Sequence, residues 1–567
     1  RWAQVDSLMR DGRFADALTA TDGLLAEAQG SGDALLQFAA HMRRSSLRQL
    51  TGTDRLVVLR DLDRTTDSLA AAGAPLPLVP LLHSALAEAW WNAYSDDRWR
   101  VLERGRTADD PDDPETWSQA TYMDHILRHV HRSLEPLDSL KAFATADLRG
   151  LLRTVPTASG TAEPGALALR PTLFDLLGHR ALDLLRNPET RLAEPADAFQ
   201  VNDPRHFALF DAFFFGPFHH ADSGAWGLQA LRLYQRLERA HQSDDHPDAL
   251  VDATLGRLAH VRAHSTLPNA DSLYYGALHT LRSRVPDDSC WSEVTLAIAT
   301  WHAERADRYD PLVSDAHRDE RRTALALCDE AIARFPGSTG ARNAAVLRAQ
   351  LRDRELDLRS EEAAMPGRDL LLSLRYRNTP RVWLRVVKDP QEPGRDRRWS
   401  RDHQEWLLQQ RPVRSWTMDL PDDGDLNPHR VDLPVDGLPA GRYAVLVCDS
   451  ARFAAGKDRI AYTHVQVTRF ALAQRSHGAA QDLLVMDRWS GQPLAGVKVS
   501  LYGQRAGADQ LVKLGEAVTD AEGRPTPDIA PANGRQMLVL EQGDDRWMAD
   551  AGYRWWNGEP PQGDSVR

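Results

Sequence analysis

Asp369-Leu-Leu-Leu-Ser-Leu-Arg-Tyr376 is the stretch of sequence that decides the fold class. Its apolar residues alternate with other residues, and Arg381-Val-Trp-Leu-Arg-Val-Val-Lys388 repeats the pattern. Because successive side chains of a strand point to opposite faces, each stretch predicts a β-strand with one apolar face. Between them lies Arg377-Asn-Thr-Pro380, in which Asn tolerates a left-handed backbone and Pro fixes φ. This segment predicts either a hairpin or another short strand connection.

Further alternating segments follow downstream. The clearest contains Gly441-Arg-Tyr-Ala-Val-Leu-Val-Cys448, in which Tyr443, Val445 and Val447 face one way and the intervening residues face the other. Weaker alternations cover residues 413–420, 429–435 and 460–470. About six strands with partly apolar faces predict a β-sandwich over residues 366–472.

A second strand-rich segment begins with Asp482-Leu-Leu-Val-Met-Asp-Arg-Trp-Ser-Gly-Gln-Pro-Leu-Ala-Gly-Val-Lys-Val-Ser-Leu-Tyr502. It contains two apolar runs separated by a Ser-Gly turn, and Val518-Thr-Asp-Ala-Glu-Gly523 supplies another turn. The segment predicts a second Ig-like β-sandwich over residues 478–556. The predicted fold is therefore multidomain, with β-sandwiches in its last third.

Residues 1–360 have a different pattern, with small and apolar residues spaced three and four apart, which is typical of helix faces. The clearest unit is a helix over 323–335, a Pro336-Gly-Ser338 turn and a second helix over 341–351. It resembles a tetratricopeptide-type hairpin, although no regular repeat precedes it. We expect an irregular, TPR-like helical region, with 1–165 and 166–360 as candidate subdomains.

Composition excludes two classes of function. The chain has 567 residues, 42% hydrophobic and 26% charged, and no apolar run long enough to span a bilayer. Its formal charge of −12 argues against nucleic acid as a partner, because nucleic-acid binding depends on clustered Lys and Arg. At this length the chain should form roughly three to five domains.

No catalytic or cofactor-binding motif is present, so we expect no enzyme activity and no cofactor. The sequence lacks a Gly-x-Ser-x-Gly elbow, a phosphate-binding loop and a His-Glu-x-x-His motif. Cys290, Cys328 and Cys448 are odd in number and fit no metal spacing, which predicts buried thiols and leaves the redox compartment open.

Two polar clusters contain residue types that can bind metal ions. His125 and His129 lie four residues apart on a predicted helix, with His131 close by, but no third ligand is evident and a metal is not favoured. The acidic run over residues 109–115 lacks the Gly and the regular oxygen spacing of a calcium loop. We interpret it as a solvated loop whose acids favour the start of the next helix.

Several motifs resemble those of the alpha-2-macroglobulin family of Bacteroidetes-type bacteria. The motifs are Trp90-Trp-Asn-Ala-Tyr94, residues 113–117 and 169–182, Leu374-Arg-Tyr-Arg-Asn378, Leu438-Pro-Ala-Gly-Arg-Tyr443, and the Ser490–Val497 and Thr519–Gly523 turns. The resemblance implies a helical N-terminal region followed by two macroglobulin domains. It also implies a location in the periplasm or at the outer membrane, and proteases as partners, which are trapped after they cleave a bait segment.

The parts that would act are not visible in this sequence. No cysteine begins a Cys-x-Glu-Gln thioester motif, and the family would continue through more domains beyond Arg567. The start at Arg1, without Met, predicts a processed or excised piece. Two functions remain open: the non-catalytic N-terminal part of a protease inhibitor, or a helical scaffold that docks an envelope protein or peptide, with the β-domains as spacers.

Overall fold

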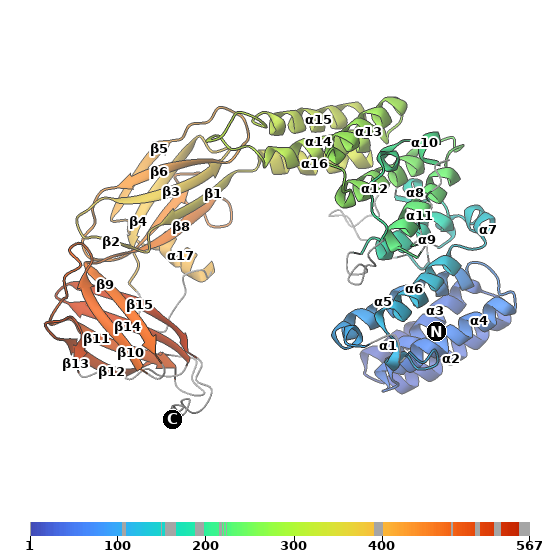
Figure 1. The fold of residues 1–567 in the computed structure, drawn as a ribbon, viewed down its shortest axis with the longest axis horizontal. Helices are drawn as coiled ribbons and strands as arrows, with labels where there is room; N and C mark the ends of the chain where they lie inside the picture. The colour runs from blue at the N-terminus through green and yellow to red at the C-terminus, as the bar shows by residue number, and fades with distance from the viewer. Residues whose placement is uncertain are drawn as a thin grey trace, which may run out of the picture. The chain divides into compact units, whose positions relative to one another are not determined.

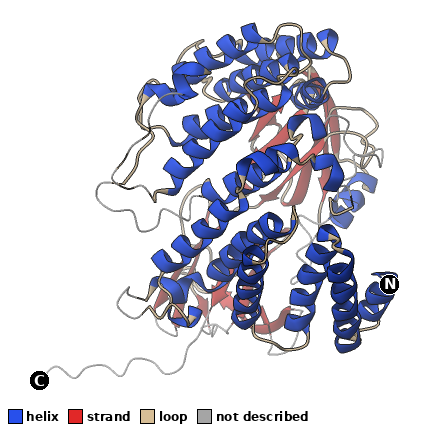
Figure 2. Cartoon of the chain, turned by 90° about the vertical axis from the view of Figure 1, so that its right-hand side faces the viewer, coloured by secondary structure: helices blue, strands red, loops and turns tan. Residues whose placement is uncertain are grey.

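The computed structural model describes residues 2–554, apart from 105–108, 149, 153–165, 188–197, 215–217, 219, 221, 223, 391–400, 478–479, 505–510 and 527–533. The chain forms two compact units. One comprises Arg1–Arg305 with Thr323–Arg348, and the other comprises Ala306–Arg322 with Ala349–Arg567. The first is built from helices and the second mainly from strands (Figure 1, Figure 2), which confirms the predicted order of fold classes. Among the described residues, no helix combines the length and apolar character needed to cross a bilayer.

The helical unit is a succession of helices of 4 to 25 residues. They are α1 (Trp2–Arg10), α2 (Phe14–Ser31), α3 (Ala34–Leu50), α4 (Arg55–Ala71), α5 (Leu78–Leu102), α6 (Gln119–Ser133), α7 (Leu137–Ala142), α8 (Ala166–Leu169), α9 (Leu173–Leu185), α10 (Asp211–Phe214), α11 (Trp226–Ala240), α12 (Asp248–His264), α13 (Ala270–Arg284), α14 (Trp291–Ala306), α15 (Glu320–Arg334) and α16 (Thr339–Arg352).

Polar side chains fix where several of these helices begin. The carboxylate of Asp54 accepts hydrogen bonds from the first backbone N–H groups of α4, and Ser118 does the same for α6. Thr172 and Asp175 form a reciprocal capping box at the start of α9. The predicted role of the acidic loop is confirmed at Asp109, whose carboxylate accepts from the backbone N–H of Ser118 at 2.7 Å. The loop therefore positions α6.

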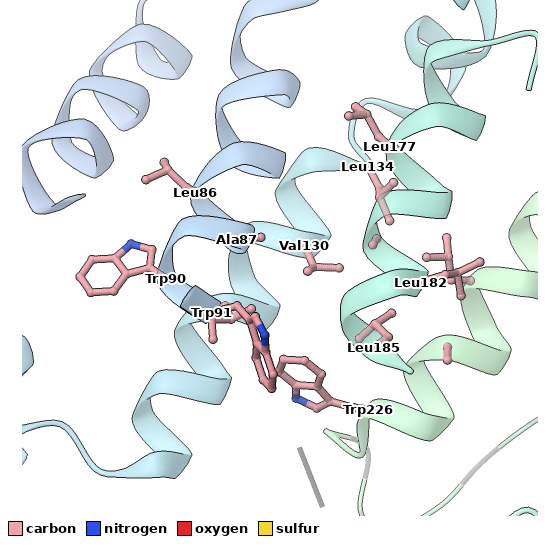
Figure 3. Packing of buried hydrophobic residues seen from close by; sticks show 14 of the residues in the cluster. Leu86, Ala87, Trp90, Trp91, Val130, Leu134, Leu177, Leu182, Leu185 and Trp226 are labelled. Carbon is pink, nitrogen blue, oxygen red and sulfur yellow. The ribbon is translucent and has the colours of Figure 1, made fainter. Parts of the chain in front are cut away.

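One large apolar core joins the helices from α3 to α12. Figure 3 shows its centre, where α5, α6, α9 and α11 bring together Leu86, Ala87, Trp90, Trp91, Val130, Leu134, Leu177, Leu182, Leu185 and Trp226. Because this core includes residues on both sides of position 165, the structure does not separate 1–165 from 166–360 there. Smaller cores hold the remaining helices, including α1 and α2 at the start of the chain.

The predicted helical pair near residue 330 is confirmed as α15 and α16. Its close packing depends on Gly340, in the first turn of α16. A Cβ atom at Gly340 would lie 2.3 Å from the backbone nitrogen of Glu293 and 2.4 Å from the carbonyl carbon of Ser292, both in α14. Backbone atoms cannot rotate away as a side chain can, so α16 reaches this position only without a side chain.

We expect the substitution Gly340→Ala to lower the free energy of unfolding of the helical unit by about 1–3 kcal/mol, as overpacking does. Gly276→Ala in α13 is the matched control, because nothing lies within 4 Å of its added Cβ. The control substitution should instead raise the free energy of unfolding of the helical unit by about 0.5–1 kcal/mol. Denaturant unfolding of both variants checks this, and equal shifts would contradict the close approach.

The first β-sandwich packs a three-stranded sheet, β1-β3-β6, against a five-stranded sheet, β2-β8-β7-β4-β5. All neighbours are antiparallel except β2 and β8. The strands are β1 (Glu355–Ser360), β2 (Ala363–Ala364), β3 (Leu370–Arg377), β4 (Arg381–Lys388), β5 (Arg414–Asp419), β6 (His429–Val435), β7 (Gly441–Cys448) and β8 (Ile460–Val467).

The connection from β3 to β4 is not a hairpin. It carries the chain from one sheet to the other, through Asn378 with a positive φ of 52°. The predicted inward faces of both strands are confirmed as buried. Strand β7 is apolar on both faces because its outer face packs against α17 (Arg401–Gln409), a helix that was not predicted from the sequence.

The second β-sandwich packs the hairpin β9-β10 against the sheet β13-β12-β11-β14-β15. Its strands are β9 (Phe470–His477), β10 (Ala480–Asp487), β11 (Lys498–Gln504), β12 (Leu511–Thr519), β13 (Pro525–Thr526), β14 (Gly534–Gln542) and β15 (Asp545–Arg554).

Two boundaries between the β-rich segments and their neighbours differ from those expected. Strand β1 begins at Glu355, before the helical region was expected to end, and Phe470 opens the second sandwich rather than ending the first. The expected end of the second sandwich at 556 lies outside the described residues.

Candidate functional site

The three cysteines do not form a reactive site. All three are buried, as predicted. Burial raises the pKa of Cys328 and of Cys448 to about 11, and it also raises the pKa of Cys290. Because the thiolate is the nucleophilic form, these thiols are poor nucleophiles at neutral pH.

The histidines of α6 have a different environment. His125 and His129 lie one turn apart, and their Nε2 atoms are 3.2 Å from each other. Helix α4 brings Asp63 to both of them: Oδ2 lies 3.2 Å from Nε2 of His125, and Oδ1 lies 3.2 Å from Nε2 of His129. The two histidine side chains are 10% and 4% exposed, so the cluster is largely shielded from water.

Two further side chains support this cluster. The indole N–H of Trp90 donates to the Asp63 carboxylate, with nitrogen–oxygen distances of 3.2 and 3.3 Å. The Nδ1 atoms of His83 and His129 lie 3.0 Å apart. Burial tends to raise the pKa of Asp63, but hydrogen bonds from His125 and His129 outweigh it and hold the pKa at about 2. Burial lowers the pKa of His83 to about 4, so its imidazole is neutral at pH 7.

His131, the third histidine of the predicted helix, is separate from the cluster. It lines a cavity of about 1100 Å³ between α4, α5, α6 and α11. Three arginines also line it: Arg132 pairs with Asp67, Arg236 pairs with Glu135 at 3.0 Å, and Arg232 donates to the Phe218 carbonyl at 3.0 Å. Within the described residues Arg232 has no carboxylate partner.

Two other clusters combine aspartate and histidine, both in the second unit. In one, Asp389 lies 3.5 Å from His403 and 3.3 Å from His464, and the guanidinium of Arg442 lies 3.1 Å from the same carboxylate. In the other, Asp423 and Asp425 both pair with Arg318, and His429 lies 2.9 Å from Asp425 and 3.8 Å from Asp423. An arginine therefore already supplies a positive charge at each of them.

A buried histidine of the helical unit is held between two carboxylates. The ring nitrogens of His241 lie 2.6 Å from Asp175 and 2.6 Å from Asp244. Burial tends to lower its pKa, but the two carboxylates outweigh it and raise the pKa above the ordinary value. A histidine with a raised pKa in the folded state stabilises the protein below its unfolded-state pKa, and this contribution is lost as the pH rises through the folded-state pKa.

We therefore expect His241→Gln to destabilise the helical unit by about 1–3 kcal/mol at low pH, where it removes a charged hydrogen-bond donor. The difference from the natural chain should shrink as the pH rises above about 6.5, the ordinary pKa of histidine, and through the raised pKa of His241. Denaturant unfolding at a series of pH values below and above about 6.5 is the measurement. The control is His246→Gln, an exposed position in the same loop. A deficit that is constant with pH would contradict a charged His241.

Sequence reasoning found part of the α6 cluster and missed the rest. His125 and His129 stood out through their spacing, whereas Asp63 lies 62 positions before His125 on another helix. His83 and Trp90 come from a third helix, α5. No local pattern links these positions, so only the packing of α4, α5 and α6 brings them together.

Comparison with protein-family models finds no match, and neither does comparison with curated proteins. Among solved structures, a fragment of native alpha-2-macroglobulin from Escherichia coli spanning domains MG0-NIE-MG1 is similar at 16% identity and a TM-score of 0.26. The match covers 35% of this chain and 64% of that fragment, less than two thirds of its length. A shorter fragment, NIE-MG1, matches at 16% identity, a TM-score of 0.25, and 35% and 98% coverage. Red sea bream transglutaminase matches at 11% identity, a TM-score of 0.19, and 39% and 34% coverage. These weak structural similarities do not assign the chain to a family.

Proposed function

We propose that this chain is a non-catalytic part of an alpha-2-macroglobulin-like endopeptidase inhibitor that traps proteases in the bacterial envelope, in the periplasm or at the outer membrane. The observation that carries the proposal is the succession of two β-sandwiches after a helical region. Strand β8 ends at Val467 and β9 begins at Phe470, so the sandwiches follow each other almost directly. Sandwiches in series suit a role in holding other segments in position.

The places of the family-like motifs support this proposal. Leu374-Arg-Tyr-Arg-Asn378 ends β3, and the Asn378 amide donates to the carbonyls of Leu351 and Asp353, at 2.9 Å each. The turn that ends at Gly523 is equally constrained, because a Cβ there would lie 2.5 Å from the carbonyl oxygen of Val485. The motifs thus fix the connections of the sandwiches, as the family resemblance leads us to expect.

The buried cysteines support a non-covalent role for these residues. A trap can hold a protease through a reactive thioester or by enclosing it. Since no Cys-x-Glu-Gln motif is present and the thiols have raised pKa values, these residues do not supply covalent capture. Their part in the proposed trap is to position the segments that enclose the protease.

The experiment uses the natural full-length protein with several unrelated proteases. We expect one principal cut with each protease, followed by compaction that is visible as faster migration in native gels. The trapped protease should keep its activity on small peptides and lose activity on large protein substrates. A cut protein with unchanged mobility, together with full activity on large substrates, would refute the proposal.

A second candidate function is docking of an envelope protein or peptide by the helical unit. The observation that favours it is the cavity lined by Arg132, Arg232 and Arg236, in which Arg232 bonds only a carbonyl among the described residues. The cavity lining contains three guanidinium groups and two carboxylates, so it carries a net positive charge. This charge favours a partner segment with acidic side chains.

Capture from a periplasmic extract tests docking with the whole chain. We expect Arg232→Glu to abolish capture of the partner, because it reverses the charge in the cavity. Arg430→Glu, on the exposed face of β6, is the matched charge reversal elsewhere and should leave capture unchanged. Equal capture by all three proteins would rule out the cavity as the docking site.

A further inference from the structure

We propose that Asp63, His125 and His129 form a binding site for one Zn²⁺ ion, which joins helix α4 to helix α6. Both histidines belong to α6 and the aspartate belongs to α4. Two histidines one helical turn apart are a recurrent way to hold zinc from one face of a helix, and they need a third ligand from elsewhere. Asp63 is that third ligand.

The distances between the ligand atoms match zinc geometry. The two imidazole Nε2 atoms lie 3.2 Å apart, and each lies 3.2 Å from an oxygen of Asp63. In a tetrahedral site with bonds of about 2.0–2.1 Å, neighbouring ligand atoms are about 3.3 Å apart. An ion therefore fits above the triangle of ligand atoms with little movement. Because each histidine approaches a different oxygen, a small rotation of the carboxylate selects one oxygen as the ligand.

The charge balance of the cluster favours a cation. Among the described residues, Asp63 forms ion pairs only with the two imidazoles, and no arginine or lysine pairs with it. The clusters at Asp389 and Asp425 instead contain Arg442 and Arg318. A permanent positive charge already lies beside those carboxylates and would repel a metal ion. Of the three clusters, the one at Asp63 has a carboxylate whose negative charge is not neutralised by any arginine that the structure describes, so this charge is available to Zn²⁺.

The surrounding groups are arranged as the outer partners of a metal site are. With zinc on Nε2 of His129, its Nδ1–H donates to Nδ1 of His83, at the observed distance of 3.0 Å. The Trp90 N–H holds the Asp63 carboxylate in place at 3.2 Å. Such partners fix the tautomer and the orientation of the ligands. The competing explanation is a metal-free network, in which Asp63 accepts N–H groups from Trp90 and both histidines.

Three protein ligands leave a fourth position, which a water molecule would take. His83 separates His129 from the neighbouring cavity, which it lines, whereas the two histidine ligands do not line it. The site is therefore suited to a stabilising ion rather than to one that meets a substrate. Zinc would join α4 to α6, although Asp63 and His125 lie 62 positions apart in the chain.

The test titrates the whole chain, stripped of metal and free of a histidine tag, with Zn²⁺ against a chromophoric chelator. We expect one Zn²⁺ per chain, and affinity at least about 100-fold weaker in Asp63→Asn and in His129→Gln. The matched control is His403→Gln, which alters the histidine–aspartate cluster beside Arg442 and should bind zinc as the natural chain does. Substitution with Co²⁺ should give the visible absorption of a tetrahedral site in the natural chain only.

A variant outside the ligand set distinguishes the loss of zinc binding from the loss of folding. His83→Phe leaves all three ligands in place, and it should weaken zinc binding about 10–100-fold while circular dichroism shows a folded protein. Zinc should also raise the melting temperature of the natural chain and not that of Asp63→Asn. If the natural chain binds zinc no more tightly than Asp63→Asn, the metal-free network is correct. Loss of binding in His403→Gln with retention in Asp63→Asn would place the ion elsewhere and also overturn the proposal.

Discussion

Replacing Glu238 by Leu is expected to destabilise the helical unit by about 3–5 kcal/mol, because it leaves the charge of Arg257 buried without a counter-ion. Both side chains are 0% exposed, and Nε of Arg257 lies 2.6 Å from the Glu238 carboxylate. The guanidinium also donates to the backbone carbonyls of His206 and Ala208, and it lies 3.7 Å from the ring centre of Phe213. Water cannot reach this charge when its partner is removed.

The double substitution Glu238→Leu with Arg257→Met distinguishes an unpaired charge from lost packing. It removes both charges and should recover most of the lost stability, because apolar replacement of a buried pair is often nearly neutral. Glu304→Gln is the control for an exposed pair: Glu304 is 53% exposed beside Arg262, and its loss should cost at most about 1 kcal/mol. Denaturant unfolding measures all three proteins. A double variant as unstable as Glu238→Leu would contradict this explanation.

Replacing Trp90 by Ala should cost about 3–5 kcal/mol, the usual cost of removing a large buried aromatic side chain. Trp90 is fully buried, and its ring centre lies 5.2 Å from that of Trp117 and 4.9 Å from that of His125. The substitution opens a cavity where α5 meets α6, and it also removes the N–H donor to Asp63.

Trp99→Ala on the same helix is the matched control. Trp99 is 70% exposed, so its removal should change the free energy of unfolding by at most about 0.5 kcal/mol. Thermal and denaturant unfolding of both variants measure the difference. Similar losses at the two positions would mean that α5 contributes through helix propensity rather than through the burial of Trp90.

The strands were predictable because alternation is a local signal. Leu372 and Leu374 in β3 and Val445 and Val447 in β7 lie where the period-two pattern places them, on buried faces. Helix α17 was missed because Arg and Asp surround it in the sequence. Leu407 of this helix is buried, and its contact with the outer face of β7 depends on tertiary structure.

The candidate metal site shows the opposite case. The spacing of His125 and His129 is visible in the sequence, but zinc was not favoured because a third ligand was lacking. Asp63 lies in an ordinary amphipathic helix with acids on either side, at Asp61 and Asp67, and nothing local distinguishes it from them. Its role follows from the packing of α4 beside α6, which depends on core residues distant from all three ligands.

The way in which the chain is divided limits where it can be cut into separate pieces. Residues 306–322 belong to the β-rich unit, residues 323–348 return to the helical unit, and helix α15 begins in one and ends in the other. Neither unit is a single run of sequence. The chain passes between its units three times, so no single cut leaves both units complete. A cut after Arg305 removes residues 323–348 from the helical unit, whereas a cut after Arg348 removes residues 306–322 from the β-rich unit.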